Sequence, residues 1–153
     1  MIKAITNFHS NYLAPQEFED LSSKVQHAAY SLEAARILSE TSDLLVDEAV
    51  KATALKFSDK NLIEKSNYSP ESEVNFKQAI KYFLKIITYS LVAGDTGPID
   101  NYLISELNEI KNSFDLFPCY IEALKYIRDN NCLSKNVALE ANIYFDDVID
   151  ALS

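Results

Sequence analysis

Residues 71–93 read ESEVNFKQAIKYFLKIITYSLVA, a stretch rich in apolar residues. Its apolar side chains recur every three or four residues, which predicts a helix with one broad apolar face. They are Val74, Ala79, Ile80, Phe83, Leu84, Ile87, Leu91 and Val92. The pattern stops at Gly94, a residue that commonly follows a helix end. We therefore expect a central core helix over residues 71–93.

The same spacing occurs on both sides of this segment. Before it, Pro15 opens a long amphipathic stretch that Ser42 and Asp43 interrupt, so we expect two helices there and a surface loop over residues 58–70. After it, Gly97-Pro98 and Pro118 mark new helix starts. The expected flanking helices cover residues 16–40, 43–57, 99–113, 120–129 and 136–152.

Composition supports a fold made of helices alone. The 153 residues are 48% hydrophobic and include only two glycines and four prolines, which is too few for a turn-rich β-sandwich or barrel. No segment reads as a strand, and no repeat or linker divides the chain. We predict one all-α domain over residues 1–153, a globin-like bundle over 15–153 with an N-terminal helical extension over about 1–14.

The charge of the chain excludes several classes of partner. A formal net charge of −9 repels both nucleic acid and an anionic membrane surface. No apolar run approaches the roughly 20 residues that a membrane span needs. Cys119 and Cys132 form no CxxC motif, so the sequence suggests neither a zinc site nor a disulfide framework. We expect a soluble protein of a reducing compartment that spans no membrane.

The residues that catalysis requires are also missing. His9 and His27 are the only histidines, and no serine or cysteine stands in a strained turn flanked by glycine. No histidine lies in the central helices, which disfavours a haem globin. Neighbouring carboxylates such as Asp146 and Asp147 point in different directions on a helix, so they favour a solvated face over a metal site. We expect a protein that is not an enzyme.

Two features leave alternatives open. The chain has nine tyrosines, which belong either to a helical core and its interfaces or to a pocket for a flat ligand. The N-terminal Ile2, Ile5 and Phe8, together with the apolar side of residues 16–40, form an overhang. This overhang either docks on another subunit or packs within the chain.

Three segments carry a family resemblance: YSLEAAR at 30–36, ITYSLVAGDTGPIDNYLI at 87–104 and YIEALKYI at 120–127. They resemble the phycocyanin α subunits of the phycobiliprotein family, and the likeness runs from about residue 10 to the end. It implies a globin-like fold that pairs with a β subunit as a heterodimer. Such heterodimers build trimeric and hexameric rings, held with linker proteins in phycobilisome light-harvesting antennas on the cytoplasmic or plastid stromal face of the thylakoid membrane.

The resemblance also identifies an expected loss. The family carries Cys-x-Arg-Asp for thioether attachment and hydrogen bonding of an open-chain tetrapyrrole, a bilin, where this chain has Phe76, Lys77, Gln78 and Ala79. Without the thiol no thioether forms, and without the carboxylate the pyrrole N–H groups lose a charge-assisted acceptor. We expect no bilin at this site. The remaining pocket positions are expected to pack on Phe76; they are Tyr102, Phe114, Leu116 and Tyr120.

Cys132 offers an alternative attachment point. The segment around Cys132 resembles an Arg-Asp-x-x-Cys motif of phycoerythrin α chains, whose cysteine carries a second bilin. The competing hypothesis is therefore that one bilin is attached to Cys132. Cys119 is expected to be a small buried apolar residue. A third hypothesis is a sensor that holds a bilin or another flat ligand noncovalently near Tyr102 and Phe114. In a loose alignment, the resemblance places Asn7 at the position where family α chains have an aspartate that contacts the β subunit.

Overall fold

The computed structural model describes residues 14–58, 70–103, 105, 107 and 116–153, and all its regular elements are helices. They are the α-helices α2 (Pro15–Ser58), α4 (Pro70–Ala93), α6 (Phe117–Asp129) and α7 (Lys135–Leu152), and the π-helical turn η1 (Ile99–Leu103). The predicted loop at 58–70 and the extension at 1–14 lie almost wholly outside the described residues. None of the described helices is long and apolar enough to cross a membrane.

The helix α2 corrects the prediction of two helices. It is continuous through Ser42 and Asp43. The Asp43 carboxylate binds Lys81 of α4 at 3.0 Å instead of capping a new helix, and the Thr41 hydroxyl donates to the Ile37 carbonyl at 2.7 Å. Leu45 and Val46, directly after the expected break, are buried in the core. Tertiary contacts therefore outweigh the local helix-ending preference of these residues.

The central helix α4 ends as the sequence predicts. Gly94 has a φ of 74°, the left-handed conformation that glycine adopts without a steric penalty. Its N–H donates to the Ser90 carbonyl at 2.8 Å and closes the last turn. The next segment is helical as predicted, and its residues Ile99–Leu103 form the π-helical turn η1, with Ile99 and Leu103 buried.

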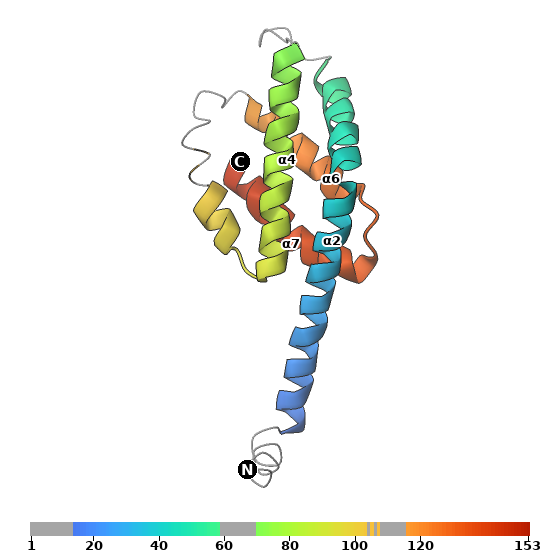
Figure 1. Ribbon diagram of the computed structural model, residues 1–153, viewed down its shortest axis with the longest axis vertical. Helices are drawn as coiled ribbons and strands as arrows, with labels where there is room; N and C mark the ends of the chain where they lie inside the picture. The colour runs from blue at the N-terminus through green and yellow to red at the C-terminus, as the bar shows by residue number, and fades with distance from the viewer. Residues whose placement is uncertain (1–13, 59–69, 104, 106, 108–115) are drawn as a thin grey trace.

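The core lies where α2 packs against α4, α6 and α7 (Figure 1). The fully buried side chains come from all of these helices, so the core ties distant parts of the sequence together. Only the C-terminal two thirds of α2 joins this body, since residues 15–29 are all exposed and project away from it. We call residues 15–29 the arm.

Candidate functional site

Four aromatic rings meet between α4 and α6, at the position where the sequence predicts a dismantled pigment site. Phe76 stacks on Tyr120, with ring centroids 5.3 Å apart and planes 17° from parallel. Phe83 meets the same tyrosine edge-on at 5.6 Å, and Phe117 lies 6.1 Å from it. Tyr120 is only 5% exposed. We call Phe76, Phe83, Phe117 and Tyr120 the aromatic cluster.

The predicted pocket residues lie in different surroundings. Tyr120 packs on Phe76 as expected, and Leu116 is partly buried against the core. Tyr102 lies on η1 with 55% of its surface exposed. Phe114 lies outside the described residues. Sequence reasoning missed Phe83 and Phe117, although the seven-residue spacing of Phe76 and Phe83 places both rings on one face of α4.

The other two positions of the expected anchor, Gln78 and Ala79, form no ring contact because neither side chain is aromatic. Gln78 is exposed, and Ala79 is partly buried against the core. Between Phe76 and Gln78, Lys77 binds Asp47 of α2 at 3.0 Å. The hydrogen bond from Lys77 keeps the pKa of the Asp47 carboxyl below its ordinary value. The ion pair of Lys77 therefore links α4 to α2.

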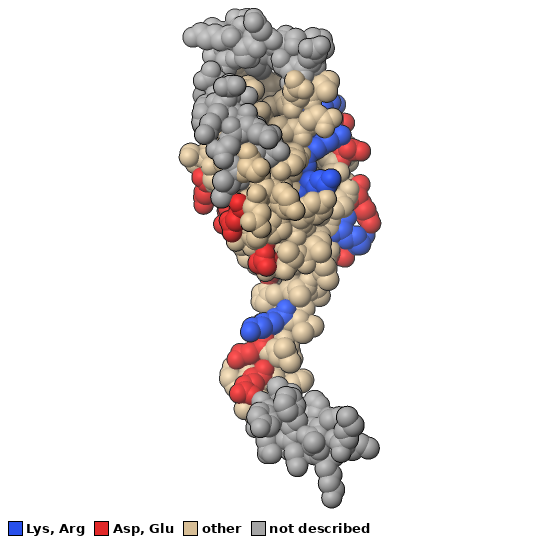
Figure 2. Space-filling view, turned by 60° about the vertical axis from the view of Figure 1, so that its left-hand side comes forward, with Lys and Arg blue, Asp and Glu red and all other residues tan. Residues whose placement is uncertain are grey.

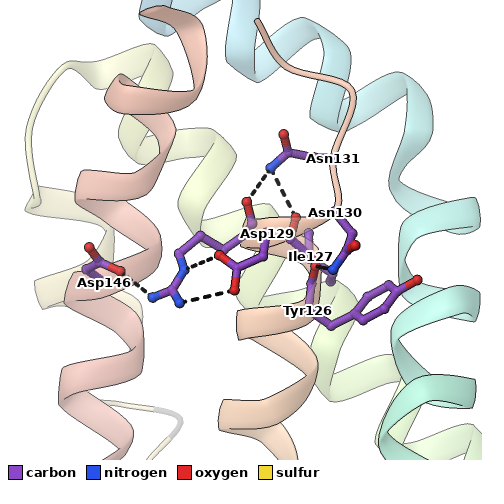
Figure 3. A network of polar contacts seen from close by, with 7 residues as sticks. Tyr126, Ile127, Asp129, Asn130, Asn131 and Asp146 are labelled. Carbon is purple, nitrogen blue, oxygen red and sulfur yellow. Dashed lines mark hydrogen bonds and ion pairs between the residues drawn. The ribbon is translucent and has the colours of Figure 1, made fainter. Parts of the chain in front are cut away.

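Cys132 lies in the short loop between α6 and α7 and is exposed. The Asn131 amide fixes this loop, donating to the Ile127 and Arg128 carbonyls at 3.0 and 2.9 Å while its oxygen accepts from the Leu133 N–H at 3.1 Å. Arg128 binds Asp129 at 2.9 Å and Asp146 of α7 at 2.8 Å (Figure 3). The backbone beside Cys132 is thus held while its thiol faces solvent.

Cys119 differs from Cys132 in its surroundings. It is half-buried in the first turn of α6. Burial raises the pKa of its thiol, and the nearby Glu122 raises it further. A thiol in this environment is a poor nucleophile. In the described ranges, no group of three or more histidine, cysteine, aspartate or glutamate side chains could hold a metal ion.

The arm presents an uncovered apolar surface. Phe18, Leu21 and Val25 are each between 51% and 63% exposed, so the described residues leave most of these side chains uncovered. Ile2, Ile5 and Phe8 of the overhang lie outside the described residues. At the root of the arm, His27 contacts Glu140 of α7, and Ser31 donates to the same carboxylate at 3.5 Å. Figure 2 shows acidic side chains near the far end of the described arm.

The fold and these surfaces define an all-helical protein with a projecting arm. Comparison with known sequences then identifies the family. The family described as "Phycobilisome protein" matches residues 4–152, so the chain belongs to the phycobilisome proteins.

Individual relatives agree with this assignment. The chain is 33% identical to the phycoerythrocyanin alpha chain of Nostoc sp. over 94% of its own length and 90% of the relative's. It is 31% identical to the C-phycoerythrin alpha chain of Synechocystis sp. over 99% and 96%. It is 34% identical to the C-phycoerythrin alpha chain of Pseudanabaena tenuis over 90% and 87%.

These comparisons confirm several predictions made from the sequence. The fold is the all-helical phycobiliprotein fold with a long N-terminal helix, and the chain is of the α type. It is a light-harvesting protein of the phycobilisome and not an enzyme. The particular likeness to phycocyanin and the loss of the bilin anchor stay predictions.

Proposed function

We propose that this α-type phycobilisome subunit carries no bilin at the usual site and serves as a structural or assembly partner of a β subunit. One observation supports the proposal: Phe76, which the resemblance aligns with the attachment cysteine, stacks on Tyr120 with ring centroids 5.3 Å apart. A phenyl ring forms no thioether. Its stacking also joins α4 to α6 through apolar contact, which is a structural role for this position.

The exposed arm supports the partnership with a β subunit. An apolar stripe on a projecting helix is the kind of surface that another subunit covers. The relatives are named as alpha chains, which fits a chain that pairs with a second type of subunit. Such pairs would build rings in a phycobilisome, with linker proteins, on the cytoplasmic or stromal face of the thylakoid membrane.

The test is to look for covalent pigment on the protein from its native source. After denaturing electrophoresis, zinc staining makes any bound bilin fluoresce. We expect no fluorescence from this chain and a bright band from a pigmented α chain run beside it. Zinc-dependent fluorescence from this chain would overturn its role as a pigment-free subunit, and loss of that fluorescence in Cys132→Ser or in Cys119→Ser would identify the attachment thiol. A pull-down with β subunits tests the partnership separately, and its failure would remove the assembly role.

A restored anchor provides the complementary experiment. The triple variant Phe76→Cys, Gln78→Arg, Ala79→Asp is coexpressed with a bilin supply and an attachment enzyme for α chains. We expect the triple variant to gain zinc-dependent fluorescence, with Phe76→Ser, Gln78→Arg, Ala79→Asp as the control that lacks the thiol. Equal fluorescence from the unaltered chain would contradict the proposed loss.

The exposure of Cys132 favours a second candidate, an antenna subunit with one bilin on that thiol. The held loop and the neighbouring Arg128, which could meet an acidic pigment group, support it. In this case Cys132→Ala abolishes zinc-dependent fluorescence and Cys119→Ala leaves it unchanged. The noncovalent sensor remains a third prediction, and titration with free bilin that causes no spectral shift would exclude it.

A further inference from the structure

The boundary between the arm and the body lies within about one helical turn of α2. Every residue of the arm is exposed, and Ser31 is the first buried residue of the helix. Among the described residues, the side chains of the arm form hydrogen bonds with near neighbours along the chain, except at His27. His27 contacts Glu140 of α7. The polar contact between the described arm and the body is therefore made by His27.

The side chain of Glu140 joins both sides of this boundary. One carboxylate oxygen meets Nδ1 of His27, and the other accepts a hydrogen bond from the Ser31 hydroxyl at 3.5 Å. Because a carboxylate only accepts hydrogen bonds, Nδ1 of His27 is the donor. Positions 27 and 31 lie on the same face of a helix, one turn apart. The Glu140 side chain is 14% exposed, so it depends on donors that the protein supplies.

The neighbours of Glu140 on α7 do not supply such donors. Burial raises the pKa of the Tyr144 hydroxyl one turn further along, and Glu140, Asp95 and Asp147 raise it further. In the described parts of the chain, no lysine or arginine forms an ion pair with Glu140. The polar contact of Glu140 with α2 therefore depends on the histidine and the serine.

The contact of His27 shortens the part of α2 that projects without support (Figure 1). From Pro15 to His27 the helix rises by about 18 Å, whereas from Pro15 to Ser31 it rises by about 24 Å. An isolated helix of either length is marginal in water. Without the His27 contact, the turn before Ser31 would become part of the unsupported segment.

We propose that Glu140 acts as a clasp that fixes the direction in which the arm leaves the body. Ser31 alone holds α2 at one point, and His27 adds a second point on the same face of the helix. Two points define the direction of a helix, whereas one point leaves it free to pivot. This goes beyond the proposed function, because the clasp is a contact within one chain and acts without a partner.

Hydrogen exchange of the full chain, followed by mass spectrometry, tests the clasp. His27→Ala and Glu140→Ala should each speed the exchange of the amides of residues 24–30 by about fivefold, because each removes the hydrogen bond that supports this turn. The amides of residues 34–50, within the body, should change by less than about twofold. Alanine is a better helix former than histidine, so helix propensity alone would slow the exchange after His27→Ala.

Lys56→Ala is the matched control, because it removes a different contact of α2, the ion pair with Glu122 of α6 at 2.5 Å. It should leave the exchange of residues 24–30 unchanged. The double variant His27→Ala, Glu140→Ala should exchange no faster than Glu140→Ala alone, because the two residues act through one contact. Unchanged exchange in His27→Ala, an equal effect of Lys56→Ala, or additive effects in the double variant would each overturn the clasp.

The direction of the arm is measured separately, as the distance between two nitroxide spin labels. One label is attached to the exposed Cys132 and the other to Glu19→Cys in the arm, in a Cys119→Ser background. We expect one narrow distribution of distances, which His27→Ala broadens and Lys56→Ala does not. An equally broad distribution in all three chains would show that the contact does not fix the arm, and would overturn the proposal.

Discussion

Tyr120 is the residue on which the aromatic cluster depends, since it contacts Phe76, Phe83 and Phe117. Replacing it by alanine removes all three ring contacts and opens a cavity. We expect Tyr120→Ala to lower the free energy of unfolding by about 3–5 kcal/mol, measured by urea denaturation. Tyr102→Ala is the matched control, because Tyr102 is 55% exposed. An equal decrease in the free energy of unfolding in both variants would mean that the ring contacts of the cluster do not stabilise the fold.

Asp147 is the residue whose ionisation costs stability. Burial raises the pKa of its carboxyl, and Asp150, Asp100 and Asp146 raise it further. A raised folded-state pKa means that this group favours folding below its unfolded pKa and loses that contribution as pH rises through the folded pKa. Asp147→Asn should therefore unfold at higher urea than the unaltered chain at neutral pH, and the difference should shrink towards acid pH.

Asp146→Asn is the control for that experiment. Asp146 binds Arg128 at 2.8 Å on the surface, so its neutralisation removes a favourable contact. We expect a small loss of stability at neutral pH, opposite in sign to the effect of Asp147→Asn. Stabilisation by both variants would indicate general relief of negative charge rather than a property of Asp147.

At the scale of elements, the sequence correctly predicts helices whose bounds depend on local residue spacing. It misses features that depend on contacts with residues far away in the sequence. The periodic apolar residues of 71–93 and the following Gly94 predict α4 and its end correctly. The break at Ser42 and Asp43 is wrong because the partner of Asp43 is Lys81, on a different helix. The aromatic cluster is predicted in part. The resemblance leads to the expectation that Tyr120 packs on Phe76, but it does not predict that the ring of Phe117 on α6 also contacts Tyr120.

The loop between α6 and α7 also depends on side chains that replace helix hydrogen bonds. Asn131 donates to two carbonyls at the end of α6 and accepts from Leu133, whereas Asn130 donates only to the Tyr126 carbonyl, which its backbone N–H already reaches. We expect Asn131→Ala to cost about 1–2 kcal/mol in urea denaturation and Asn130→Ala clearly less. A larger cost for Asn130→Ala would contradict this assignment of the cap.

At the scale of the whole molecule, stability and assembly reside in different parts. The body contains every buried residue of α2, while the arm from 15 to 29 contains none. An isolated helix of this length is marginal in water, so the arm depends on its continuity with the body and on a partner that covers it. Sequence periodicity identifies the apolar side of the arm, but it cannot show that this side is uncovered, because that depends on where the body ends.

This separation leads to a prediction for the complete chain. The triple variant Phe18→Gln, Leu21→Gln, Val25→Gln keeps good helix formers in the arm and removes only its apolar surface. We expect its thermal midpoint to stay close to that of the unaltered chain while association with a β subunit is lost. The single core substitution Leu38→Ala should instead cost about 2–5 kcal/mol, because Leu38 is fully buried. Calorimetry and sedimentation on the same samples distinguish the two effects, and a large drop in the midpoint of the triple variant would show that the arm also stabilises the body.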